Sequence, residues 1–68
     1  MPTLGHAIKH ARIDKGLKAF ALAATAGITP KYLSEIENDH VDPRLSIAQR
    51  LAEILDLDLR QIHVKKTR

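Results

Sequence analysis

Four residues that stop or restart helices divide this chain into short segments. Gly16 and Gly27 each follow a segment with helical apolar spacing, and Pro30 and Pro43 stand near the starts of two others. Glycine commonly closes a helix, whereas proline is tolerated in its first turn. The chain has no hairpin turn dipeptide, while alanine and leucine occur nine times each. Since those two residue types favour helices, the sequence predicts an all-α fold.

Apolar residues recur at helical spacing in five segments, and side chains suited to helix starts precede three of them. Thr3 can cap the first segment, Thr29 before Pro30 can cap the third, and Asp58 can cap the fifth. We therefore expect a compact five-helix bundle. Its helices are predicted at about residues 4–15, 19–26, 30–37 and 45–55 and from residue 58 onward.

Composition removes several classes of protein. Sixty-eight residues allow one small domain, predicted over residues 1–64, followed by a basic flexible tail at residues 65–68. The absence of cysteine excludes disulfides, thiolate zinc sites and cysteine nucleophiles. No apolar run approaches the roughly 20 residues of a membrane span, and the first residues lack a signal-peptide pattern. We therefore expect a cytoplasmic protein without a membrane segment.

The formal net charge of +3 is unevenly distributed. Residues 1–34 hold five basic residues against one acidic residue, a balance of +4, and residues 35–64 hold three against seven, a balance of −4. The last four residues add +3, so the body of the chain is formally neutral. Net charge alone is thus weak support for nucleic-acid binding, although the basic half includes Lys18 and Lys31.

The segment from Ala19 to Asn38 has the pattern of two helices that meet at a steep angle. Gly27 can supply the positive φ of a tight turn, and Ala23 is small enough for a close helix crossing. Ile28, Leu33 and Ile36 can close the angle from the other side. This pattern predicts a helix-turn-helix in which Lys31, Ser34 and Glu35 face outward.

Short fragments occur in a fixed order over almost the whole chain. They are Leu4-Gly5, Ile8, Arg12, Gly16-Leu17, Leu22-Ala23, Ala26-Gly27-Ile28-Thr29, Tyr32-Leu33-Ser34, Ile36-Glu37-Asn38, Pro43, Leu45 and Leu55-Asp56-Leu57-Asp58-Leu59. In this order and spacing, the chain resembles the lambda-repressor-like, Cro-type helix-turn-helix family, also called the xenobiotic response element family. The resemblance extends from Leu4 to Ile62.

This resemblance implies a double-stranded DNA-binding regulator that is no enzyme and needs no cofactor or metal. The third helix would enter the major groove, and the start of the second would meet the phosphate backbone. A largely buried ion pair would join Arg12 to Glu37. The positions that correspond to DNA-contacting residues are Lys18, Ala19, Lys31, Tyr32, Ser34, Glu35, Asn38, His40 and Arg44.

Three departures from the family pattern occur near these positions. Lys18-Ala19 replaces the usual polar cap and glutamine, so only the backbone amide remains to hold a phosphate there. Pro30 cannot donate a hydrogen bond at the head of the recognition helix. Asp39 stands where glycine is usual, which predicts a non-glycine residue with positive φ, and with Asp42 it adds negative charge to the loop.

A homodimer face is expected where the apolar arc of the fourth helix is wider than one buried face requires. Ile47 and Ile54 lie seven residues apart there. The resemblance extends this face to Leu57, Leu59 and Ile62, and the alternative is that the two isoleucines are merely exposed.

Two other groups of residues resemble parts of a metal site and of a hydrolase site, but a structural role explains each better. His6 and His10 have a metal-chelating spacing, but no third ligand accompanies them, so solvent-exposed residues are the better interpretation. Ser34 with Asp39 and His40 lacks the surroundings of a hydrolase site. The tail at residues 65–68 is either a solvated end or an arm that binds phosphate or the minor groove.

Two functions remain from the sequence. The first is a sequence-specific DNA-binding transcriptional regulator that acts as a homodimer and serves as a repressor or autoregulator. The second is a protein-interaction module, such as an antitoxin or an adaptor for the transcription machinery. Ala19, Pro30 and the acidic loop favour the second, while the absence of a separate partner-binding extension weighs against it.

Overall fold

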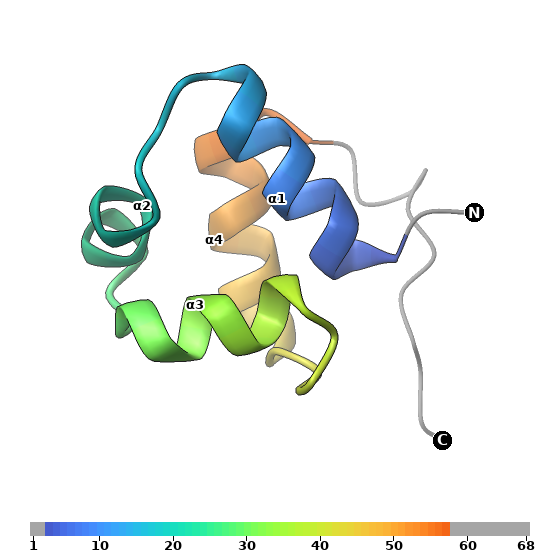
Figure 1. Cartoon of the computed structure of the whole chain (residues 1–68). Coiled ribbons are helices and arrows are strands. Elements are labelled where there is room, and N and C mark those ends of the chain that lie inside the picture. The colour runs from blue at the N-terminus through green and yellow to red at the C-terminus, as the bar shows by residue number, and fades with distance from the viewer. Residues whose placement is uncertain (1–2, 58–68) are drawn as a thin grey trace.

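The computed structural model describes residues 3–57, in which it contains four helices (Figure 1). They are α1 (Leu4–Asp14), α2 (Ala19–Ala26), α3 (Pro30–Glu37) and α4 (Leu45–Leu55). The all-α class is confirmed, with four helices in place of the expected five. The fifth expected helix, from residue 58 onward, lies outside the described residues, as does the tail at 65–68.

Two threonines fix where helices begin. The hydroxyl oxygen of Thr3 accepts a hydrogen bond from the backbone N–H of His6 at 3.2 Å, and that of Thr29 accepts one from Tyr32 at 3.0 Å. Each hydroxyl satisfies an N–H group that has no partner within its helix. Pro30 occupies the first position of α3, where its missing N–H costs no hydrogen bond. The expected starts of α1 and α3 are thereby explained.

A residue with left-handed backbone conformation follows each of the four helices, within two residues of its last one. Gly16 and Gly27 have φ values of 69° and 76°, and Asp39 and Asp56 have φ values of 61° and 59°. The residue after each of them donates its backbone N–H to a carbonyl in the last turn of the helix, as Ile28 N does to Ala23 O at 2.9 Å. The expected positive φ at Asp39 is present. Aspartate tolerates this conformation better than most residues with a side chain.

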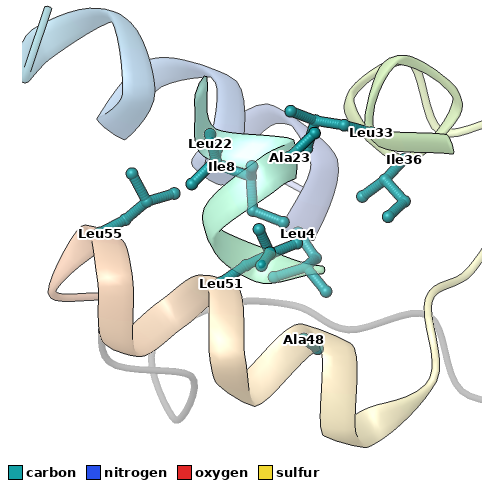
Figure 2. Close-up of a cluster of buried hydrophobic side chains, with 10 residues drawn as sticks. Leu4, Ile8, Leu22, Ala23, Leu33, Ile36, Ala48, Leu51 and Leu55 are labelled. Atoms are coloured by element: carbon teal, nitrogen blue, oxygen red, sulfur yellow. The ribbon is translucent and has the colours of Figure 1, made fainter. Parts of the chain in front are cut away.

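One apolar cluster draws side chains from all four helices (Figure 2). Its largest fully buried members are Ile8, Leu22, Leu33, Ile36, Leu51 and Leu55. Each such side chain contributes about 1.5–3 kcal/mol through its removal from water. Ala23 and Ala26 are also fully enclosed, so α2 approaches its neighbours through small side chains.

The helices are arranged so that α1 and α2 each pack against both α3 and α4. In Figure 1, α3 crosses the lower edge of the molecule, and its outer face is not covered by the other helices drawn. Among residues 3–57, the longest helices have 11 residues, and none is long and apolar enough to cross a membrane.

Candidate DNA interface

The turn between α2 and α3 is short and held by backbone hydrogen bonds. Gly27 takes the left-handed conformation, its N–H donates to Ala24 O at 3.2 Å, and Ile28 follows with its side chain packed against the core. Thr29 is extended and caps α3. Two helices joined by three residues at a steep angle form a helix-turn-helix.

The outer face of α3 carries the polar residues expected there. Lys31 and Ser34 are exposed, and Glu35 is half-buried. Asn38 donates from its side-chain amide to Ser34 O at 2.9 Å, and the same nitrogen lies 3.4 Å from Ser34 Oγ. Tyr32 differs from these residues because its side chain packs against the core. The structure therefore groups Lys31, Ser34, Glu35 and Asn38 on one surface, with Tyr32 at its side.

The start of α2 presents backbone N–H groups and one ammonium group. Lys18 is the extended residue before the helix, and its side chain makes no capping hydrogen bond. The first N–H groups of a helix lack intrahelical partners and carry partial positive charge, so they favour an anion. Ala19, half-buried, is the first helical residue. This end of α2 therefore has no side-chain acceptor that competes with a phosphate.

A largely buried ion pair connects α1 to the end of α3. Arg12 Nε and Nη2 donate to Glu37 Oε2 and Oε1 at 2.8 and 3.2 Å, and the side chains are 15% and 6% exposed. Arg12 Nη1 also donates to Leu17 O at 3.1 Å, in the segment that leads into α2. One guanidinium thus links α1 to the end of α3 and to the segment before α2. The resemblance places α3 and the start of α2 on DNA.

One of the two acidic residues in the loop after α3 is bonded to the start of α1, although it stays exposed. Thr3 Oγ1 donates to Asp39 Oδ2 at 2.9 Å, which brings the carboxylate to the start of α1. A Cβ atom at Gly5 would overlap Ile36 O and lie only 2.6 Å from Asp39 Oδ1, so glycine permits this close packing. A carboxylate is favourable at a helix N-terminus. This contact gives Asp39 a structural role and draws its charge toward α1.

The other loop residues named from the sequence remain accessible. His40, Asp42 and Arg44 are exposed, and Arg44 is the extended residue that precedes α4. Like Lys18 before α2, Arg44 makes no side-chain capping hydrogen bond. Arginine has only donors and cannot cap a helix start, so this exposed guanidinium can instead donate to a partner.

Comparison with known proteins places this arrangement in a family. The Helix-turn-helix family model, of the Cro/C1 type, matches residues 8–62. The chain belongs to this family. It is a family of DNA-binding regulators and not of enzymes, so both the resemblance and the non-enzymatic expectation are confirmed.

Two solved structures and one phage protein are similar to this helix-turn-helix chain. SinR in complex with DNA, described as the master regulator for biofilm formation, has a TM-score of 0.77 and 30% identity, covering 87% of this chain and 95% of that one. The N-terminal DNA-binding domain of SinR from Bacillus subtilis has a TM-score of 0.79 and 29% identity, covering 96% of each chain. The ImmF control region 10 kDa protein of Bacillus phage phi105 is 39% identical over 56 residues. This match covers 82% of the present chain but only 62% of the phage protein.

The sequence interpretation missed a hydrogen bond that supports the helix-turn-helix. Arg50 Nη1, from α4, donates to Ala26 O at 2.9 Å and so satisfies a carbonyl at the end of α2. The two residues are 24 positions apart. No local spacing signals such a contact, because it depends on how α4 lies beside α2.

Three exposed apolar side chains were also missed. Ile13, Phe20 and Leu45 are 57%, 63% and 68% exposed. Phe20 lies in the first turn of α2, a helix without a charged residue and with Thr25 as its sole polar side chain. Since α2 has only one polar residue, its hydropathy pattern does not show which of its apolar residues face solvent.

The residues expected at a dimer face have mixed positions. Ile47, Ile54 and Leu57 are half-buried and pack against the core of this domain, so only part of each remains for another molecule. Leu59 and Ile62 lie outside the described residues.

His6 and His10 are exposed on α1, and residues 3–57 contain no group of three or more side chains suited to a metal ion.

Proposed function

We propose that this protein is a sequence-specific double-stranded DNA-binding transcriptional regulator whose α3 enters the major groove. The observation that carries the proposal is its likeness to the SinR structure determined with DNA, over nearly the whole of both chains. The exposed polar face of α3 and the uncapped start of α2 support it, because they supply base-reading and phosphate-binding groups respectively.

The proposed regulator acts as a homodimer and as a repressor or autoregulator. Dimers of helix-turn-helix domains read two half-sites about one helical turn apart, roughly 34 Å. The remaining exposed parts of Ile47, Ile54 and Leu57 supply an apolar surface on the described domain, which Leu59 and Ile62 would extend. Replacement of Ile54 by lysine is expected to convert a dimer into a folded monomer in sedimentation. An unchanged sedimentation coefficient would place the interface elsewhere.

DNA recognition is tested by selection of bound duplexes from a random pool. The unmodified protein is expected to enrich one motif with two related half-sites, whereas Lys31→Ala loses that enrichment. Lys9→Ala is the matched control, because Lys9 is an equally charged, exposed residue on α1. If the unmodified protein enriches no motif, or if Lys31→Ala enriches the same motif equally well, this function is wrong.

The second candidate is a protein-interaction module, such as an antitoxin or an adaptor. It is favoured by Phe20, whose ring is 63% exposed on a helix that offers almost no polar side chains. Exposed aromatic side chains are common anchors of protein interfaces. If this second function holds, Phe20→Ser disrupts the protein complex, whereas Lys31→Ala leaves the complex intact and has no effect on DNA binding.

A further inference from the structure

The outer face of α3 presents hydrogen-bonding groups of opposite kinds one helical turn apart. Lys31 has three N–H donors and no acceptor, whereas an ionised Glu35 has only acceptors. Residues four apart on a helix are neighbours about 6 Å from each other, close enough for an ion pair. Within residues 3–57, however, Lys31 and Glu35 form no ion pair. Neither charged group has an ion-pair partner among residues 3–57, so both can bind an external partner.

The hydroxyl group of Ser34 is available mainly as a hydrogen-bond donor. The amide of Asn38 is bonded to Ser34 O at 2.9 Å and lies 3.4 Å from Ser34 Oγ, where it approaches the lone pairs of the hydroxyl. In the described part of the chain, Ser34 Oγ donates no hydrogen bond of its own. Its O–H is thus available next to Lys31, which makes this part of the surface rich in donors.

Pro30 adds no hydrogen-bonding side chain to the outward face of α3. It is the first residue of α3, is exposed, and has neither an N–H nor a polar side chain. Hydrogen bonding by the outward face of α3 is consequently concentrated in Lys31 and Ser34 as donors and Glu35 as acceptor.

The base pair that matches this pattern is G·C. In the major groove, guanine displays two acceptors, N7 and O6, and its paired cytosine displays the N4 amino donor beside them. Lysine pairs well with guanine, and glutamate accepts from cytosine N4. An A·T pair places the O4 acceptor of thymine where the carboxylate would need the N4 donor of cytosine, and adenine offers one acceptor where guanine offers two.

We propose, on the basis of the DNA-binding function proposed above, that α3 reads a G·C pair in each half-site. Guanine faces Lys31 and Ser34, and cytosine faces Glu35. Glu35 also discriminates by repulsion, because a carboxylate placed in the groove without a donor is close to phosphates and loses water without compensation. The acidic residue in a DNA-facing helix therefore provides specificity at the expense of non-specific affinity.

The experiment compares motifs selected from random duplexes by the unmodified protein, Glu35→Gln and Glu53→Gln, with helix content measured for each. Every half-site selected by the unmodified protein is expected to contain a G·C pair whose replacement by A·T weakens binding about 5–100-fold, the range for one good base contact. In Glu35→Gln, the fold preference for G·C over A·T falls to less than about half of its value in the unmodified protein. Binding to unrelated DNA becomes tighter. Glu53→Gln is the control, because this substitution removes the same charge from an exposed position on α4.

Two results would overturn the G·C assignment while leaving DNA binding intact. One is a selected motif without an invariant G·C pair in each half-site, and the other is an unaltered motif and discrimination in Glu35→Gln. Absence of any enriched motif for the unmodified protein would refute the proposed function itself and the assignment with it. Retention of full helix content by Glu35→Gln would exclude unfolding as the cause of a lost preference.

Discussion

Replacement of Glu37 by glutamine should destabilise the domain far more than a surface substitution does. The carboxylate is 6% exposed and accepts two hydrogen bonds from Arg12 at 2.8 and 3.2 Å. Glu37→Gln leaves the guanidinium, 15% exposed, without its counter-charge. Removing one partner of such a pair costs about 3–5 kcal/mol. We take about 3 kcal/mol, because Arg12 keeps its bond to Leu17 O and glutamine can still accept one hydrogen bond.

A loss of this size is a large share of the total stability of so small a domain. Natural domains have about 0.05–0.15 kcal/mol of unfolding free energy per residue, which gives roughly 3–10 kcal/mol for a chain of this length. Urea unfolding followed by circular dichroism is the assay. With a slope of about 1 kcal/mol per M for a small protein, the midpoint should fall by about 3 M, or the variant should be largely unfolded without urea.

The double variant Arg12→Met, Glu37→Leu distinguishes a trapped charge from lost packing. Replacing both members of a buried ion pair by apolar residues of similar volume is often neutral, so its unfolding free energy should return to within about 1 kcal/mol of the original. Glu53→Gln, on the exposed face of α4, should change stability by less than about 0.5 kcal/mol. A loss below 1 kcal/mol in Glu37→Gln, or a double variant no better than the single one, would refute this reasoning.

Three further substitutions test contacts between helices by urea unfolding. Gly5→Ala should cost about 3 kcal/mol because its Cβ would overlap a backbone carbonyl, whereas Gly16→Ala has open space and should cost only about 1–2 kcal/mol for its φ of 69°. Equal losses at the two glycines would contradict the close packing at Gly5. Arg50→Met should cost about 1 kcal/mol through the loss of a hydrogen bond to the end of α2, and an unchanged midpoint would show that water replaces it. Thr3→Val should cost about 1–2 kcal/mol because it removes both a helix cap and a donor to Asp39, whereas Thr3→Ser should retain both, and equal losses would contradict the capping role.

The sequence by itself determined where the described helices lie. The expected ranges for α2, α3 and α4 coincide with those observed, and α1 ends one residue earlier than expected. These boundaries depend on residues within one turn of each helix end: Thr29 and Pro30 at the start of α3, and Gly27 at the end of α2. Capping and positive φ are local properties, so a linear pattern contains them.

The family could also be predicted from the sequence, because its pattern combines such local signals in a fixed order. The outward face of α3 followed from helical periodicity once the apolar positions Leu33 and Ile36 were assigned to the core. Lys31 and Ser34 are exposed as that periodicity requires. Tyr32 lies toward the core instead, which periodicity in an eight-residue helix does not resolve.

Only the tertiary structure decided which distant groups meet. Thr3 donates to Asp39 across 36 positions, and Arg50 reaches the end of α2 across 24. Such contacts depend on the angles and distances at which whole helices pack, which no local spacing specifies. The aspartate that departs from the family's glycine is the clearest case. Its positive φ is a local property visible in the sequence, but its role at the start of α1 exists only because α3 ends beside Gly5.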